Sequence, residues 1–454
     1  MIGRGHLVDG EMVKPVTDLE EENEDAQFEG ESVPRDLFFD PWLIVHRCGS
    51  RRHPFVEQVV GSLSRIEDRK RSRRGADHER HCDLVETLIA NLAISILSGP
   101  PFRAVAVTLA KPESERSRYE RGILRKLPDT LRGLQNSGLI NLWISRERNK
   151  VSTMTPTVAL VAMARVYNFT GADLARAAGE ETVILSQTER DHVARTERRH
   201  LINYHDTAET RRFRAELTQI NDHLADADIA FLVNDGAVNV SQRRLRRIFN
   251  VPSWMPCDTV RFDMGGRLFD GWWQRIKGER RHLIRIDGEA ICDLDYSSMY
   301  TRLAYLHVGE MPPEGDLYRA IAGIETEDHR DGIKQVINAL LCRMGAFQRL
   351  SSEAKSLLPL SLQSAKSVRA AVLAAHPALA SVIEAGLGFE FMKTESDIMV
   401  ALLLRLASIG ITALPMHDGI MTAHSLADIA TEVMGDISEE LLGYRLPVKA
   451  KKLS

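Results

Sequence analysis

The chain has 454 residues, of which 44% are hydrophobic and 27% charged, a composition ordinary for a globular protein with two or three substantial cores. The sequence contains no run of about twenty apolar residues and its first residues lack a signal-peptide core, so we expect a cytoplasmic protein that does not interact with membranes. The five cysteines are scattered and odd in number, which excludes a disulfide-stapled scaffold and fits a reducing compartment.

The net charge of −4 is unevenly distributed along the chain. Residues 1–40 hold 12 acidic and 3 basic side chains, so the remainder carries a net charge of +5. We predict that residues 1–40 form an acidic disordered tail, because they are too polar and too charged to build a core. The tail either keeps the protein soluble, which we favour, or mimics nucleic acid and competes for a basic cleft.

Residues 41–168 are predicted to form an N-terminal domain. Leucines and isoleucines recur at helical spacing over Asp83–Leu97, before Gly99-Pro100-Pro101 stops the helix. Within Tyr119–Leu160 a helix interrupted at Pro128, a hairpin and a Thr-Pro-Thr helix start follow one another, an order similar to a winged helix-turn-helix. Its cationic side chains are Arg125, Lys126 and Arg132 near the recognition helix and Arg146, Arg148 and Lys150 in the wing. The segment either contacts DNA or is a small packing domain with an exposed hairpin.

Residues 169–252 are predicted to form a helical, thumb-like region. Thr207 is a plausible N-cap, and an apolar stripe follows it at helical spacing. The members of this stripe are Phe213, Leu217, Ile220 and Leu224.

The stretch Ile291–Leu303 begins as a β-prone strand and ends as a helix. Asp295 stands where the strand ends, which is a good position for holding a divalent ion. Asp293 either assists such ions or caps the strand end, and we favour the cap. Residues 411–423 read as a hairpin with His417 and Asp418 at its turn, where Gly419 is expected to supply a positive φ. Two aspartates from separate strands are the minimal ligands for a two-metal nucleotidyl transfer.

A third segment, Arg330–Arg343, is predicted to be an amphipathic helix. Arg330 and Lys334 lie four residues apart and therefore share one face of it. Two neighbouring cations repel each other, so the pairing does not stabilise a helix by itself, but it suits an incoming triphosphate.

These segments resemble the motifs of family A polymerases, the group of bacterial polymerase I and the single-subunit phage polymerases. Asp295-Tyr-Ser-x-x-x-x-Arg302 resembles motif A, Arg330-x-x-x-Lys334 resembles the motif B helix, and His417-Asp418 resembles motif C. Gly266-Arg267-Leu268 is similar to the segment whose arginine touches the primer–template minor groove.

The resemblance implies an α+β right-hand polymerase with thumb, palm and fingers, whose palm and fingers occupy residues 253–454. It implies Mg²⁺ as the cofactor, with two ions and with Mn²⁺ as a substitute, and primed DNA and dNTPs as partners. The implied catalytic residues are Asp295, Asp418 and Lys334, and the implied metal ligands are Asp295, Tyr296 and Asp418. The implied nucleotide-binding residues are Arg330, Lys334, Asn338, Tyr300 and Cys342. The implied nucleic-acid-binding residues are Arg267, Arg302 and His417.

The sequence also departs from that family's pattern. Tyr300 stands where its DNA polymerases carry a glutamate that excludes the 2′-OH, and a bulky side chain there favours deoxynucleotides. Asn338 and Cys342 replace aromatic residues of motif B, and Gly419 replaces an acidic residue or serine. The first 250 residues show no convincing arrangement of carboxylates for a proofreading exonuclease.

The sequence thus predicts a two-metal, DNA-directed DNA polymerase without proofreading, serving a phage, plasmid or mobile element. One alternative is an RNA polymerase or primase built on the same palm. The other is a non-catalytic, DNA-binding replication initiator in which the aspartates are structural.

Overall fold

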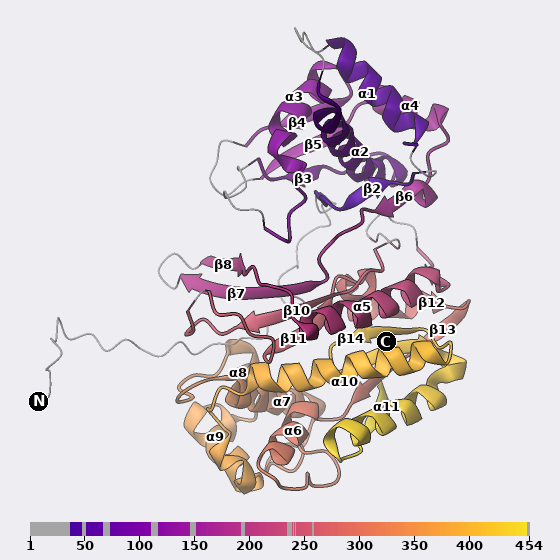
Figure 1. The fold of residues 1–454 in the computed structure, drawn as a ribbon. Helices are drawn as coiled ribbons and strands as arrows, with labels where there is room; N and C mark the ends of the chain where they lie inside the picture. The colour runs from indigo at the N-terminus through magenta and orange to yellow at the C-terminus, as the bar shows by residue number, and fades with distance from the viewer. Residues whose placement is uncertain are drawn as a thin grey trace, which may run out of the picture.

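The computed structural model describes residues 37–451 except for 48–50, 67–72, 110–116, 146–150, 192–195, 234–237, 239, 241 and 257. It is a mixed α+β structure with several small sheets and two hydrophobic cores. One core draws on residues between Leu43 and Phe169, and the larger one on residues between Val183 and Leu446. Figure 1 shows the two parts stacked, with the indigo and purple N-terminal part above the rest. The acidic tail and the expected wing cations Arg146, Arg148 and Lys150 lie outside the described residues.

The N-terminal part packs four helices around a four-stranded sheet of order β1-β3-β5-β4. The helices are α1 (Pro54–Ile66), α2 (Gly75–Leu97), α3 (Leu127–Asn136) and α4 (Val158–Val166). The strands are β1 (Leu37–Phe38), β3 (Val105–Val107), β4 (Ile140–Trp143) and β5 (Ser152–Pro156), with β2 (Leu43–Val45) and β6 (Leu174–Arg176) forming a separate pair. The predicted order of helix, hairpin and helix is present. Pro128 does not interrupt α3, because it lies in the first turn, where a missing N–H costs nothing.

A second four-stranded sheet, of order β11-β10-β7-β8, begins the larger part. Its strands are β7 (Val183–Asp191), β8 (Thr196–Leu201), β10 (Arg246–Val251) and β11 (Gly265–Phe269). Thr207 caps α5 (Ala208–Asp226), and the predicted apolar stripe of that helix is buried. The expectation of a helical thumb at 169–252 is wrong in one respect: in its described residues α5 is accompanied by strands, and both belong to the larger core.

The sheet that carries the acidic residues has the order β14-β15-β13-β12-β9. Strand β16 pairs with the second half of β13, on the edge opposite β15, while β12 pairs with the start of β13. Its strands are β9 (Ile229–Phe231), β12 (Ile284–Ile286), β13 (Glu289–Tyr296), β14 (Ala413–Met416), β15 (Gly419–Ala423) and β16 (Val448–Lys451). The helices around it are α6 (Met299–His307), α7 (Glu327–Cys342), α8 (Ser352–Leu357), α9 (Ala365–Ala375), α10 (Gly388–Ser408) and α11 (Ala427–Leu442). Figure 1 shows these orange and yellow helices gathered below the strands.

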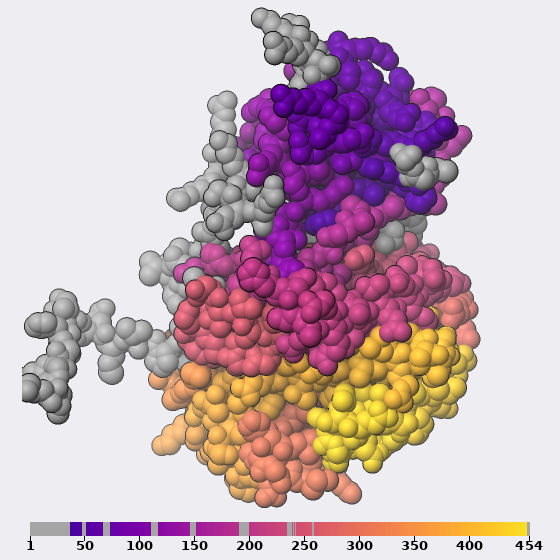
Figure 2. Space-filling model, viewed as in Figure 1, coloured from indigo at the N-terminus to yellow at the C-terminus, as the bar shows by residue number. Residues whose placement is uncertain are grey.

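The two parts are joined by part-buried and exposed hydrogen bonds and ion pairs. Arg118 donates from Nε to Glu181 Oε2 over 2.9 Å and from one terminal nitrogen to Asp206 Oδ1 over 2.6 Å. The Tyr119 hydroxyl donates to the carbonyl of Ile202 over 2.8 Å. Figure 2 shows the molecule narrowing where the purple part meets the magenta segments. Among the described residues no helix is long and apolar enough to cross a bilayer.

Candidate active site

Strand pairing brings Asp295 and Asp418 together. Asp295 of β13 lies opposite Gly419 of β15, and the amide of Tyr296 donates to the carbonyl of Asp418 over 3.1 Å. Asp418 is therefore held at the end of the strand that carries Asp295. The two carboxylates act on each other electrostatically, since the charge of Asp418 contributes to the pKa of Asp295.

The turn between β14 and β15 differs from the expected one. The positive φ falls on His417, at 54°, whereas Gly419 is not among the residues with positive φ. Gly419 is required for a different reason, which is space. A Cβ on Gly419 would lie 2.5 Å from the carbonyl oxygen of Leu294 and 2.7 Å from Oδ1 of Asp295. An acidic residue or serine at this position would therefore collide with the strand and with the carboxylate that it faces.

Asp295 is buried, with 4% of its surface exposed, while Asp418 is half-buried. Burial, followed by the charge of Asp418, raises the pKa of Asp295 to about 7. One of its carboxylate oxygens, Oδ1, is buried and has no hydrogen-bond partner. An ion would satisfy this oxygen and remove the repulsion between the two aspartates, so the residues fit a hard divalent cation.

The described residues contain no ready cluster of three His, Cys, Asp or Glu side chains for a metal. A site of two carboxylates agrees with Mg²⁺ chemistry, because Mg²⁺ keeps waters and takes further ligands from substrate phosphates. Tyr296 offers no side-chain ligand, which limits the expected role of this residue. Its hydroxyl points to the opposite side of β13 and donates to the carbonyl of Met434 over 2.7 Å, so its backbone carbonyl is the group that remains.

The sequence-based prediction missed two lysines on β16. In the strand register Lys449 lies opposite Asp295 and Lys451 opposite Asp293. Lys451 Nζ lies 3.1 Å from Oδ2 of Asp295. Burial and the neighbouring cations Arg330 and Lys334 lower the pKa of Lys449. The alternation of lysines near the C-terminus was visible in the sequence, but its pairing with β13 was not.

Helix α7 turns part of its cationic face toward the aspartates. Lys334 is exposed, and its charge favours the ionised form of Asp295. Arg330 is half-buried: its Nε donates to Asp316 Oδ2 over 2.5 Å, and its guanidinium lies 5.2 Å from the ring centre of Tyr318. Of the predicted pair, Lys334 is thus the cation exposed on this helix, whereas Arg330 is tied to a neighbouring loop.

Two other predicted residues of α7 behave differently from each other. Asn338 is half-buried, and its Oδ1 is buried without a hydrogen-bond partner. Cys342 is the last residue of α7 and is buried against α10. A Cβ on Gly388 would lie only 2.6 Å from its sulfur atom. The expected role of Cys342 in nucleotide binding is therefore replaced by helix packing.

Arg267, Glu395 and Tyr300 form one buried polar group. Arg267 of β11 donates to both carboxylate oxygens of Glu395, over 2.7 and 2.8 Å, and to the hydroxyl of Tyr300 over 3.0 Å. Glu395 is 1% exposed and lies beyond the first turn of α10, so it is held in the core by Arg267 and is not a solvent-facing charge of the first turn. Arg267 is 14% exposed and is committed to these partners, which leaves little of it for a minor-groove contact in this conformation.

Arg302 was expected to contact nucleic acid and does not reach the surface. It is 1% exposed, and its guanidinium binds three backbone carbonyls and the Tyr444 hydroxyl. These carbonyls belong to Ser297, Pro313 and Gly315. The periodicity placed Arg302 off the apolar stripe of its helix, but the loop after α6 and the segment before β16 cover it.

His417 reaches solvent at the turn, with its ring edge-on to Phe269 at 6.2 Å. The protein around the turn, and then the charge of Arg267, lower its pKa to about 4. His417 is therefore neutral at physiological pH and offers a hydrogen bond rather than a positive charge to a nucleic acid.

Asp293 does not cap a strand end. It lies within β13 and is 2% exposed, and side chains two residues apart share a strand face, so it faces the same side as Asp295. Arg281 lies in the 3-10 turn η4 (Gly278–Leu283), with one terminal nitrogen 3.6 Å from Asp293 Oδ2. No motif indicated this pair, because its members become neighbours only through the fold.

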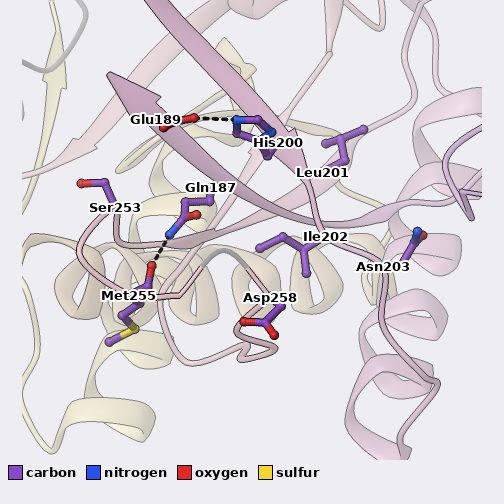
Figure 3. Close-up of a pocket in the computed structure, with 9 residues that line it drawn as sticks. All are labelled: Gln187, Glu189, His200, Leu201, Ile202, Asn203, Ser253, Met255 and Asp258. Carbon is purple, nitrogen blue, oxygen red and sulfur yellow. Dashed lines mark hydrogen bonds and ion pairs between the residues drawn. The ribbon is translucent and has the colours of Figure 1, made fainter. Parts of the chain in front are cut away.

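A separate cavity of about 580 Å³ opens beside β7 and β8. Figure 3 shows Gln187 in its wall, donating to the carbonyl of Met255, and His200 paired with Glu189 at its rim. None of the aspartates of the candidate site lines this cavity.

No protein-family model matches this chain, and no curated protein matches it at a significant level. The chemistry of the site is therefore interpreted from its own residues.

Proposed function

We propose that the chain is a metal-dependent nucleotidyltransferase, specifically a template-directed DNA polymerase of the family A type. The observation that carries this proposal is the meeting of Asp295 and Asp418 on adjacent strands, with an unpartnered buried oxygen on Asp295. The cationic face of α7 is a second observation in its support, because the charge of Lys334 acts on Asp295.

In this mechanism Asp295, Asp418 and the backbone carbonyl of Tyr296 would hold Mg²⁺. The bound metal supplies Lewis-acid chemistry, lowering the pKa of a primer 3′-OH and neutralising charge on the triphosphate. In the proposal Lys334 binds the outer phosphates and donates a proton to the departing pyrophosphate. Asn338 on α7 contacts the base or sugar, and the neutral ring of His417 positions the primer end.

The N-terminal part fits a DNA-contacting module in this proposal. Arg125, Lys126 and Arg132 are exposed at α3 or directly before it, and Arg132 pairs with exposed Asp129 over 3.3 Å. Exposed cations of this kind contact phosphates without reading sequence. The combination of such a module with a compact polymerase suits replication of a mobile element.

The decisive test is extension of a primed template by the purified full chain with dNTPs and Mg²⁺. Asp418→Asn is expected to reduce extension at least about 1,000-fold while duplex binding persists, because it removes one of two metal-binding carboxylates. Asp436→Asn is the matched control, since this aspartate is exposed on α11 and pairs with Arg445. Equal extension by Asp418→Asn and wild type would refute the metal assignment. Absence of extension by the wild-type chain would favour the non-catalytic initiator.

A further inference from the structure

Arg281 has an unusual environment for an arginine that is largely covered by protein. Its side chain is 19% exposed, and its Nε is buried with no hydrogen-bond partner. Its contact with Asp293 is 3.6 Å long, which exceeds the usual length of a charge-assisted hydrogen bond. The guanidinium is therefore oriented by a carboxylate but not saturated by it.

Asp293 is unsaturated as well. Its Oδ1 is buried without a hydrogen-bond partner. Burial raises the pKa of Asp293, while Lys451 and Arg281 oppose this rise. A buried pair in which both members keep an unpaired polar atom is costly, and a ligand that completes the pair would remove that cost.

The position of Arg281 indicates which part of a substrate it meets. Arg281 lies in η4, which packs against β13, and one of its terminal nitrogens faces Asp293 on that strand. Its charge also acts on His417 of the β14–β15 turn. Lys334 lies on a different element, α7, so a triphosphate bound by Lys334 leaves Arg281 for another phosphate.

We propose that Arg281, positioned by Asp293, binds a phosphodiester at the 3′ end of the primer strand. The inference rests on the proposed polymerase function. A planar guanidinium with free donors binds two oxygens of one phosphate at once, which an ammonium group cannot do. Such a contact would hold the primer end next to the turn that carries Asp418.

The adjacent Arg280 provides a matched control. It is the same residue type in the same turn, but its guanidinium lies over the ring of Phe231, 5.2 Å from the ring centre. Replacement of Arg280 removes one positive charge, as replacement of Arg281 does, but removes it from beside Phe231 and not from beside Asp293.

The test is a mutant cycle between the arginine and a single phosphate. Primer–templates carry a neutral methylphosphonate at one of the three linkages nearest the primer 3′ end, or at the tenth linkage. Affinity is measured by fluorescence anisotropy with Ca²⁺ in place of Mg²⁺, for wild type, Arg281→Gln, Arg281→Lys and Arg280→Gln. The thermal unfolding of each variant is recorded as a check of its fold.

One of the three terminal methylphosphonates is expected to weaken wild-type binding about ten-fold and to have little further effect in Arg281→Gln. Arg280→Gln should respond to it as wild type does, and Arg281→Lys should show an intermediate loss. Asp293→Asn should reduce the coupling without removing it, because it affects only the orientation of Arg281. Additive losses at all three linkages, or coupling only at the tenth, would overturn the inference.

The result also separates this inference from the proposed function. A chain that extends primers but shows no coupling at Arg281 retains the polymerase function and loses this assignment. A chain that neither binds nor extends primed DNA loses both. If Arg281→Gln does not fold, Arg281→Lys still tests the inference, since it preserves the charge and removes the two-oxygen contact. Its response to the terminal methylphosphonate should then be smaller than that of wild type.

Discussion

Lys451 Nζ lies 3.1 Å from Oδ2 of Asp295, so the last described strand of the chain places an ammonium group on the carboxylate proposed to bind metal. Lys451 is 41% exposed, which leaves its charge largely screened by water. The lysine balances the negative charge of the site while the other oxygen of Asp295 stays unpartnered.

Lys451→Met is expected to tighten binding of a divalent ion, because the ammonium group competes for the same carboxylate. The gain should be about two- to five-fold, the range of an exposed ion pair worth up to ~1 kcal/mol. Titration of Mn²⁺ followed by electron paramagnetic resonance measures it. Lys366→Met, an exposed lysine on α9, is the control and should leave the affinity unchanged. Weaker Mn²⁺ binding by Lys451→Met would show that the lysine supports the site instead of competing.

The metal-free protein should lose stability as the pH rises from about 4 to about 7. The pKa of Asp295 is raised from 3.8 to about 7, so between these values the folded state holds a proton that the unfolded state releases. The free energy of unfolding therefore falls over this window, by an amount on the order of 1–4 kcal/mol. Asp295→Asn should flatten the dependence. Thermal unfolding with a chelator at several pH values tests it, and equal slopes for both proteins would contradict the assignment.

Glu395→Leu should destabilise the protein strongly, since it leaves the guanidinium of Arg267 without its carboxylate in a buried position. Losing one partner of a buried ion pair costs about 3–5 kcal/mol. The control is Glu440→Leu, which breaks an exposed pair with Arg405 and should cost less than about 1 kcal/mol. Urea denaturation distinguishes the two variants, and similar midpoints would show that the pair of Arg267 and Glu395 does not join β11 to α10.

Gly419→Ala should damage both stability and the site. The new Cβ would lie 2.5 Å from Leu294 O and 2.7 Å from Asp295 Oδ1, so either the hairpin or the carboxylate must move. Overpacking of this kind costs about 1–3 kcal/mol. Gly61→Ala on α1 is the control: it meets no atom within 4 Å and should stabilise its helix by up to about 1 kcal/mol. A neutral Gly419→Ala in thermal unfolding would contradict the close approach.

Tyr300→Gly should relax the preference for deoxynucleotides. The tyrosine is buried beside Arg267 and Glu395, five residues after Asp295. Removing the ring opens space for a 2′-hydroxyl, so the ratio of kcat/KM for dNTPs over NTPs is expected to fall about ten-fold or more. An unchanged ratio would discard the steric role of Tyr300, and a wild-type preference for NTPs would favour the RNA polymerase alternative.

Local patterns predicted several elements correctly. The stripe of α5 and its cap at Thr207 followed from helical spacing, and the hairpin at 411–423 from a β-prone run on either side of a turn. Such features depend on a few consecutive residues, so their physical causes are already present in the sequence. The prediction of a helical thumb was wrong because local propensity does not reveal that β7 pairs with β10, a strand about sixty residues further along the chain.

The sequence by itself determined which residue types were available for chemistry: two separated aspartates, a cationic helix and a glycine after the second aspartate. Only the tertiary structure decided that β13 and β15 are neighbours, that Arg302 is enclosed while Lys334 is exposed, and that Arg281 and Lys451 join the acidic residues. The physical reason is that burial and charge pairing depend on distance in space, and residues far apart in the chain come close only when strands pair and helices pack.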